Sequence, residues 1–259
     1  MDGPEKDTDG AAIPTTLRML VILEELARIG VPVTPTAVNE ALGIPKPTIH
    51  RLFATLEAEG FLMRDIDGRS FTPGRRLRRM SVNVLSSLRV RTARLAVLGR
   101  LAEEIGETCN IAVPDREAMV YLDRVETKWP LRIQLPVGTQ VPFYCTASGK
   151  MYLSTLNPAH LERYLRAARF PPRTDKTLTE VEQIRAEIAA TRARGFGEDA
   201  EEFMEGMIAV AVPVLDDQSR LLSTVSFHAP KMRLSLAEAR RHVPKLRSAA
   251  AELVRLVLH

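Results

Sequence analysis

The sequence predicts an α+β fold in which a small N-terminal domain, a linker helix and a larger C-terminal domain follow one another. Three observations support this order. Apolar residues recur at helical spacing up to Gly60, an arginine-rich helical stretch begins at Arg75, and strands rich in β-branched residues follow Gly106, with helices around them. A chain of 259 residues with 45% hydrophobic content is long enough for two domains with cores of their own.

The stretch from Leu42 to Gly60 has the pattern of the second half of a helix-turn-helix. Its apolar residues stand three and four positions apart, which places them on one helical face: Ile49, Leu52, Phe53 and Leu56. Upstream, Thr34 followed by Pro35 is typical of a helix start, and Gly43 breaks the chain before the next helix. A further helix around Leu17 to Ile29 is expected to cover both.

Residues 61–64 and 69–72 read as two short strands around the turn dipeptide Asp67-Gly68. Such a hairpin would be the wing of a winged helix-turn-helix. The alternative is a three-helix packing module that binds no DNA, because helical hairpins with glycine turns are common.

In the N-terminal domain, the positions of the charged residues indicate more about DNA binding than the net charge does. Residues 1–74 carry seven Lys or Arg against eleven Asp or Glu, so this domain is not basic in bulk. Its polar residues nevertheless fall on the predicted reading helix and wing, where contacts to bases and phosphates would form. The candidate DNA contacts are Lys46, Thr48, His50, Arg51, Thr55, Arg64 and Arg69. From Arg75 to Arg100 there are eight arginines and no acid, a run that could lie along phosphates or form a solvated face.

We therefore expect a disordered tail over residues 1–13, a winged domain over 14–74, a linker helix over 75–89 and a second domain over 90–259. In the second domain, strands are predicted at 108–113, 118–125, 131–135, 207–215 and 221–229, with a loop over 136–142. Helices are predicted at about 148–155, 158–168, 179–194 and 235–258, the first of them capped by Thr146 and the third ended by Gly195.

Composition excludes several classes of protein. No segment has the length and hydropathy of a membrane span, and the acidic start is unlike a signal peptide, so we expect a cytoplasmic protein without a membrane partner. Cys109 and Cys145 are too few and too far apart for a zinc cluster, and we expect both to be reduced packing residues. Ser148-Gly149-Lys150 is not a phosphate-binding loop, because the upstream glycine is absent and Met151 replaces the required hydroxyl. We expect neither a metal nor a cofactor.

Several stretches in the same order resemble the isocitrate lyase regulator (IclR) family of transcriptional regulators. They are LGIPKPTIHRLFATLEAEGF, ETCNIAV, VYLDRVE, LRIQLPVGTQVPFYCTASGK, GFGEDAEEFMEGMIAVAVPV and the serine-containing strand that ends at Pro230. The resemblance implies a winged helix-turn-helix, a linker helix and a C-terminal effector domain related to the GAF fold. It also implies dimers through the DNA-binding domains, often paired into tetramers, that act on palindromic operators in double-stranded DNA.

A site for a small carboxylate effector is expected at the start of the helix near residue 147. Free backbone N–H groups at a helix start are suited to bind an acid, and Ala147, Ser148 and Gly149 follow the capping threonine. The resemblance implies that the opposite wall is formed by Asp199, Ala209, Ser226 and His228, with Met207 as an apolar neighbour. Ala209 stands where the family often has a cysteine, and His228 where it often has a serine.

Two of these residues have a simpler explanation. His228 could be a histidine satisfied at the end of a strand, and Asp199 belongs to the acidic run EDAEE, which could be a solvated loop.

The sequence thus predicts a sequence-specific DNA-binding regulator whose C-terminal domain binds a small organic acid and transmits the change through the linker helix. An enzyme using Cys145 as nucleophile and His228 as base is the rival class, although no third orienting residue is apparent. A non-sensing DNA-binding protein is the other alternative. We expect no enzyme activity.

Overall fold

The computed structural model describes residues 13–65, 67–85, 88–116, 118–130 and 133–258. The chain divides into two compact units, residues 1–85 and 86–259. The tail predicted over residues 1–13 lies, apart from Ile13, outside the described residues. None of the helices in the described ranges is long and apolar enough to cross a membrane.

The first unit contains three helices packed around one apolar core: α1 (Arg18–Ile29), α2 (Pro35–Leu42) and α3 (Lys46–Ala58). The predicted apolar stripe of α3 is buried, with Ile49 and Phe53 each 1% exposed. Thr34 caps α2 through its hydroxyl, which accepts from the Ala37 N–H at 3.2 Å. The helical part of the prediction is therefore confirmed.

The turn between α2 and α3 is held by a side chain that the sequence analysis did not single out. Gly43 has a φ of 61°, which favours glycine and ends α2. Asn39 then spans the turn, since its amide nitrogen donates to the Ile44 carbonyl at 2.7 Å and its oxygen accepts from the Ile44 N–H at 2.8 Å. These bonds fix the angle at which α3 starts.

The hairpin that follows pairs β1 (Leu62–Arg64) with β2 (Phe71–Pro73) in antiparallel register. The hairpin predicted around Asp67-Gly68 is present, but its second strand starts later than residue 69, because Arg64 pairs with Phe71. The Asp67 carboxylate organises the loop between these two residues by accepting from the Arg69 and Ser70 N–H groups and from the Ser70 hydroxyl. The hairpin is present, but its tip is set by this carboxylate.

Helix α4 (Arg75–Leu85) continues the first unit. Its start is bound to the turn that follows α3, because the Gly74 and Arg76 N–H groups donate to the carbonyls of Phe61 and Gly60. A side chain at position 74 would place a Cβ 2.3 Å from the Gly60 carbonyl oxygen, so only glycine fits there. The predicted linker helix over 75–89 is thus helical as far as Leu85, and residues 86–87 lie outside the described ranges.

The second unit is built on a six-stranded antiparallel sheet with the strand order β5-β4-β3-β8-β7-β6. Its strands are β3 (Thr108–Asp115), β4 (Ala118–Val125), β5 (Gln140–Pro142), β6 (Gly197–Ala200), β7 (Met207–Leu215) and β8 (Leu221–Pro230). Strands β3, β4, β7 and β8 match the predictions closely, because runs of β-branched residues bounded by turn residues can be recognised in the sequence.

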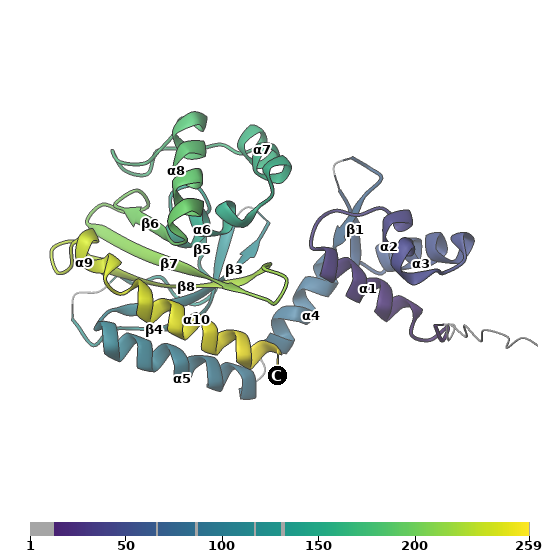
Figure 1. Ribbon diagram of the computed structural model, residues 1–259, viewed down its shortest axis with the longest axis horizontal. Helices are drawn as coiled ribbons and strands as arrows, with labels where there is room; N and C mark the ends of the chain where they lie inside the picture. Colours follow the sequence, from purple (N-terminus) through teal and green to yellow (C-terminus); the bar gives the residue numbers. More distant parts are fainter. Residues whose placement is uncertain (1–12, 66, 86–87, 117, 131–132, 259) are drawn as a thin grey trace, which may run out of the picture. The chain divides into compact units, whose positions relative to one another are not determined.

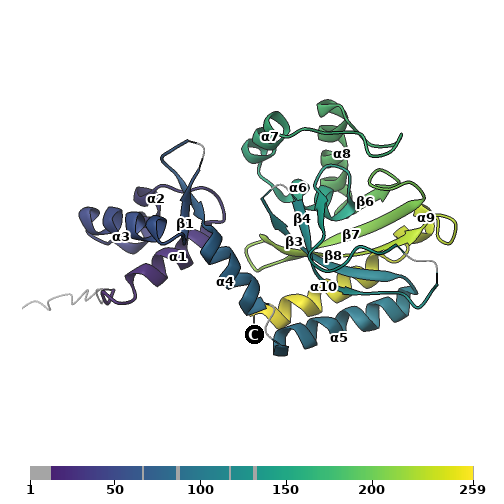
Figure 2. The same cartoon turned by 180° about the vertical axis from the view of Figure 1, so that it is seen from behind.

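Helices cover both faces of this sheet (Figures 1 and 2). On one face lie α5 (Leu88–Ile105), α9 (Leu236–Arg240) and α10 (Val243–Leu258), which enclose the larger apolar core with Val210, Val225 and Phe227 of the sheet. On the other lie α6 (Ala147–Thr155), α7 (Pro158–Ala167) and α8 (Val181–Arg194). The mixed α+β fold class is confirmed, and the face under α6 is the one that carries the candidate site.

The structure of this unit differs from the prediction in three places. In the predicted strand 131–135, residues 133–135 form no strand, and residues 131–132 lie outside the described ranges. The neighbouring stretch, which was predicted as a loop, supplies β5, and this strand pairs with β4. The predicted terminal helix is split after α9, because Pro244 has no N–H to continue the ladder. Strand β6 was missed altogether, since the sequence of Gly197–Ala200 has little strand propensity.

Candidate functional site

The start of α6 has the geometry of an anion site. The Thr146 hydroxyl accepts from the Gly149 N–H at 3.1 Å and so caps the helix. The N–H groups of Ala147 and Ser148 have no acceptor within the helix, because a helix leaves its first N–H groups without intrahelical partners. Together with the helix dipole, they favour a negatively charged group at this point.

The strands beside α6 bring three predicted residues into one row. Asp199 of β6 pairs with Ala209 of β7, and Ala209 pairs with His228 of β8. Ser226 stands two residues from His228, and it therefore points to the same face of the sheet. All four side chains are buried, with exposed fractions between 0% and 9%.

These residues and the helix start enclose one cavity. It is lined by Tyr121, Thr146, Ala147, Ser148, Asp199, Phe203, Met207, Ala209, Ser226 and His228. Its volume is about 10 Å³, which is room for about one water molecule. In this conformation the site is polar, buried and nearly closed.

Asp199 presents one carboxylate oxygen to the interior without a partner. Its Oδ1 accepts from the N–H groups of Glu202 at 2.8 Å and Phe203 at 3.3 Å, whereas Oδ2 is buried and unbonded. Burial raises the pKa of Asp199 to about 7, and the nearby Lys150 ammonium opposes this only in part. Near neutral pH the carboxyl group can therefore either donate or accept a hydrogen bond.

The other acids of the EDAEE run are held by basic partners. Glu198 binds Arg240 at 2.5 Å and 2.9 Å, and Glu202 binds Lys150 at 2.5 Å. Glu201 pairs with Lys176 and with Lys231. The solvated-loop alternative for this run is therefore wrong, because Asp199 lies on a buried edge strand with its charged neighbours neutralised.

His228 also keeps one unbonded nitrogen inside the protein. Its Nδ1 lies 3.3 Å from the Asn110 amide nitrogen, and its buried Nε2 has no partner. Burial, and secondarily the charge of Arg124, lowers the pKa of His228 to about 4, so the imidazole is neutral at physiological pH. The alternative of a histidine fully satisfied at a strand end does not describe it, since one of its two nitrogens is unbonded.

Gly149 has a packing role rather than a place on the cavity wall. A Cβ at this position would lie 2.3 Å from the Phe143 Cα and 2.4 Å from its carbonyl oxygen. The N–H of Gly149 is already used by the Thr146 cap. Gly197 is similarly constrained, since a Cβ there would lie 2.1 Å from the Ala147 carbonyl oxygen. Gly197 therefore lets α6 lie close to β6, and Gly149 lets α6 lie close to the Phe143 backbone in the turn that precedes the helix.

Sequence reasoning missed two wall residues, Tyr121 and Phe203. Both lie in stretches that resemble the IclR family. Alternation along β4 could have indicated Tyr121, but nothing local marks Phe203 as a wall residue.

On the DNA side, the candidate residues of α3 lie on its exposed surface. Lys46, His50, Arg51 and Thr55 are exposed and Thr48 is half-buried, so the helix presents a polar face opposite its core stripe. The Thr55 hydroxyl donates to the Arg51 carbonyl at 3.0 Å. Arg69 is exposed at the tip of the wing.

Arg64 is more constrained than its neighbours. Its guanidinium makes two bonds to Glu57, at 2.8 Å and 3.0 Å, donates to the Gly68 carbonyl and lies over the Phe71 ring. It therefore ties the wing to α3.

Models of two protein families match this chain. The IclR helix-turn-helix domain matches residues 15–65, and the bacterial transcriptional regulator IclR C-terminal domain matches residues 82–255. The chain belongs to the IclR family. It is a transcriptional regulator with a DNA-binding helix-turn-helix domain.

Other IclR regulators are similar over nearly their whole length. The chain is 39% identical over 239 residues to the probable transcriptional regulator SauR of Cupriavidus necator, a match that covers 92% of this chain and 95% of that protein. It is 31% identical over 246 residues to the HTH-type transcriptional regulator BhcR of Paracoccus denitrificans, with 95% and 88% covered. The crystal structure of Thermotoga maritima IclR superposes with a TM-score of 0.63 at 25% identity and covers 95% of this chain and 99% of that one.

These relatives of the IclR family are regulators of transcription and not enzymes, so the enzyme alternative is set aside. The proposed nucleophile also lacks the required chemistry. Burial raises the pKa of the Cys145 thiol to about 12, which keeps it protonated.

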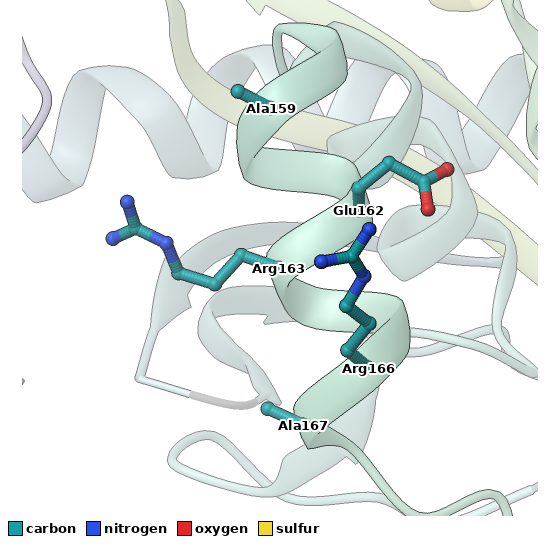
Figure 3. A pocket seen from close by; sticks show the side chains of 5 residues that line it. All are labelled: Ala159, Glu162, Arg163, Arg166 and Ala167. Atoms are coloured by element: carbon teal, nitrogen blue, oxygen red, sulfur yellow. The ribbon is translucent and has the colours of Figure 1, made fainter.

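A wider hollow of about 510 Å³ lies on α7, away from the cavity (Figure 3). It is lined by Ala159, Glu162, Arg163, Arg166 and Ala167, which project from successive turns of one helix. Because a single helix lines it, it cannot surround a small acid as the cavity under α6 can. Glu162 is moreover paired with Arg185 at 2.8 Å and 2.9 Å.

Proposed function

We propose that this IclR-family regulator binds a small organic acid in the cavity under α6, and that binding changes its affinity for operator DNA. The observation that carries the proposal is the pair of buried, unbonded polar atoms, Asp199 Oδ2 and His228 Nε2, in one cavity with the start of α6. Buried polar groups without partners are rare in folded proteins and are expected to meet a ligand or water.

The start of α6 accounts for the acid. A carboxylate placed there would accept from the N–H groups of Ala147 and Ser148 and would interact favourably with the helix dipole. Phe203, Met207 and Ala209 supply an apolar wall for the remainder of a small ligand. The site therefore suits a compact acid with an acidic group at one end.

Binding of the acid requires the cavity to widen. A volume of about 10 Å³ holds one water molecule, so the side chains or strands that line the cavity must move outward when an acid enters. A ligand that binds only the widened form shifts the protein toward it. We propose that the linker helix over residues 75–89 transmits this shift to the reading helices.

For the DNA-binding unit, we propose a dimer on a palindromic operator, with α3 in the major groove. Two-fold symmetric pairs of reading helices require half-sites of matching symmetry. Four exposed apolar residues support a protein interface on this unit. Leu17 and Leu20 belong to the start of the chain's first helix, and Met80 and Val84 belong to α4, with exposed fractions of 46% to 64%.

A thermal-shift screen of the purified full-length protein tests the acid site. The panel contains small keto, hydroxy, aromatic and dicarboxylic acids, and a ligand that binds only the folded state raises the melting temperature. We expect at least one hit that is lost in Asp199→Ala and in His228→Ala. Glu205→Ala is the matched control, because Glu205 is an exposed acid near the same segment. A hit that survives both cavity variants would place the acid elsewhere.

Selection of duplex DNA from a random library by the full-length protein tests the operator. We expect an inverted repeat, and we expect the hit from the acid screen to change the affinity for it. A ligand that leaves operator affinity unchanged would favour the non-sensing alternative.

A further inference from the structure

The cavity under α6 has a loop in its wall, which joins β6 to β7 over residues 201–206 and carries Phe203. The other lining residues belong to α6 and its cap or to strands of the sheet. Strands β4, β7 and β8 each pair with a neighbour on both edges, and α6 shares an apolar cluster with α8. Because these elements are held along their length, the loop is the part of the wall that can move with the fewest broken contacts.

This loop begins with an unusual backbone conformation. Glu201 has a φ of 69°, which lies in the left-handed region that residues other than glycine rarely adopt. A residue stays in such a conformation only where the contacts around it hold it there. Release of these contacts would therefore favour a different backbone conformation at Glu201 and a different position of the loop.

Two threonines in the segment between α7 and α8 bind the backbone of the loop. The Thr174 hydroxyl donates to the Glu201 carbonyl at 2.7 Å, and the Thr177 hydroxyl donates to the Glu202 carbonyl, also at 2.7 Å. Neither threonine lines the cavity. The loop is therefore held in place from outside the cavity, by a segment that is distant from it in the chain.

On the cavity side the loop is bound by Asp199, whose Oδ1 accepts from the Glu202 and Phe203 N–H groups. On the side of the segment between α7 and α8, the guanidinium of the exposed Arg173 lies 4.8 Å from the centre of the Phe203 ring. The Phe203 side chain thus separates the cavity from an exposed part of the protein, and an outward movement of the loop would open the cavity to solvent.

The remaining contacts of Glu201 hold the loop less firmly. Its carboxylate pairs with Lys176 and Lys231, whose side chains are 52% and 55% exposed. Ion pairs with such exposed side chains contribute little to stability. The two threonine hydroxyls are therefore the contacts whose loss should release the loop.

We propose that residues 201–206 form a lid on the cavity under α6, and that the hydroxyls of Thr174 and Thr177 are the latch that keeps this lid closed. The proposal rests on the proposed acid site and names the part of its wall that admits the acid. When the lid opens, Phe203 moves outward and the start of α6 meets solvent.

Four backbone N–H groups report the opening of the lid. Those of Glu202 and Phe203 belong to the lid itself. Those of Ala147 and Ser148 belong to the start of α6 on the cavity wall, where the two residues are 2% and 4% exposed. Because a buried amide exchanges its hydrogen only when water reaches it, opening of the lid should expose all four together.

Hydrogen–deuterium exchange of the full-length protein without acid or DNA measures this opening, with fragmentation in the mass spectrometer to resolve single amides. We expect the four amides to be protected at least about 100-fold less than those of Val210 and Phe227 in the middle of the sheet, because the lid opens while the sheet stays folded. Equal protection of the two sets would mean that the cavity opens only when the whole unit unfolds, and it would overturn the proposal.

Variants of the latch test the cause. Thr174→Val combined with Thr177→Val removes both hydroxyls, so we expect the four amides to exchange at least about tenfold faster while the two sheet amides are unchanged. The matched control is Thr174→Ser combined with Thr177→Ser, which keeps both hydroxyls and should exchange like the wild type. If the double valine variant does not fold, Thr174→Val alone decides.

Three results with the valine variants would refute the lid and its latch. Unchanged exchange at all four amides would mean that the hydroxyls do not hold the loop. Faster exchange at Glu202 and Phe203 alone would mean that the loop loosens without uncovering the start of α6. An equal acceleration of the sheet amides would mean that the threonines stabilise the whole unit. Because no acid is present in this experiment, failure of the lid is distinguishable from failure of the acid site.

Discussion

The ionisation of Asp199 should govern the pH dependence of the effector unit. In the folded protein burial raises the pKa of this carboxyl from 3.8 to about 7, whereas in the unfolded chain it returns to its ordinary value. Between pH 4 and pH 7 the unfolded chain therefore loses a proton that the folded protein keeps, and stability falls as the pH rises. Asp199→Asn, which cannot ionise, should remove this fall.

The magnitude follows from the difference between the two pKa values, which is about 3. Each whole unit corresponds to about 1.36 kcal/mol, so ionisation destabilises the folded effector unit by about 4 kcal/mol once the pH exceeds 7. The Asn oxygen can still accept from the Glu202 and Phe203 N–H groups, as Asp199 Oδ1 does. Relative to wild type, we therefore expect Asp199→Asn to become more stable by about 3 kcal/mol between pH 4.5 and pH 8, since part of the effect is already present at pH 4.5.

Urea denaturation at a series of pH values measures this difference. Trp129 is the only tryptophan in the sequence and lies in the second unit, so its fluorescence follows the unfolding of the effector unit. Asp216→Asn is a control of opposite sign. Hydrogen bonds from the Arg220 and Gln218 N–H groups and from the Arg220 side chain lower the pKa of Asp216 despite its desolvation, so that variant should lose stability above pH 4 and approach wild type as the pH falls.

A difference between Asp199→Asn and wild type that changes by less than about 1 kcal/mol over this range would refute the reasoning. It would mean that Asp199 titrates near its ordinary value and that water reaches its carboxyl group.

Three further outcomes are expected. Arg51→Ala should weaken binding to the selected operator by about 1–3 kcal/mol in fluorescence anisotropy, and equal weakening on scrambled DNA would make Arg51 a phosphate contact instead. Gly149→Ala should lower the free energy of unfolding by about 1–3 kcal/mol in urea, because its Cβ would press on the Phe143 backbone; an unchanged midpoint would contradict the close approach of α6. Lys150→Met should lower the free energy of unfolding by about 3–5 kcal/mol in urea, because it leaves the Glu202 carboxylate buried without its partner. The double variant with Glu202→Gln should recover part of this loss, whereas a loss caused only by the shape of the Met side chain would stay.

The sequence by itself determined the elements whose causes are local. The caps at Thr34 and Thr146 and the turn at Gly43 depend on atoms within a few residues, and all three form as predicted. The helical stripe of α3 and the run of apolar and β-branched residues in β7 are equally local signals. Periodicity could not indicate Asp199 or His228 as site residues, and only the family resemblance pointed to them.

The tertiary structure decided what depends on partners distant in the chain. Gly197–Ala200 becomes a strand because β7 offers a free edge and Gly197 leaves room for the Ala147 carbonyl, neither of which is visible in its own sequence. The raised pKa of Asp199 and the contacts of Asn110 with Arg124 and His228 likewise arise from burial and from side chains on separate strands. Burial and cross-strand contact are properties of the assembled sheet, and the chemistry of the site resides in them.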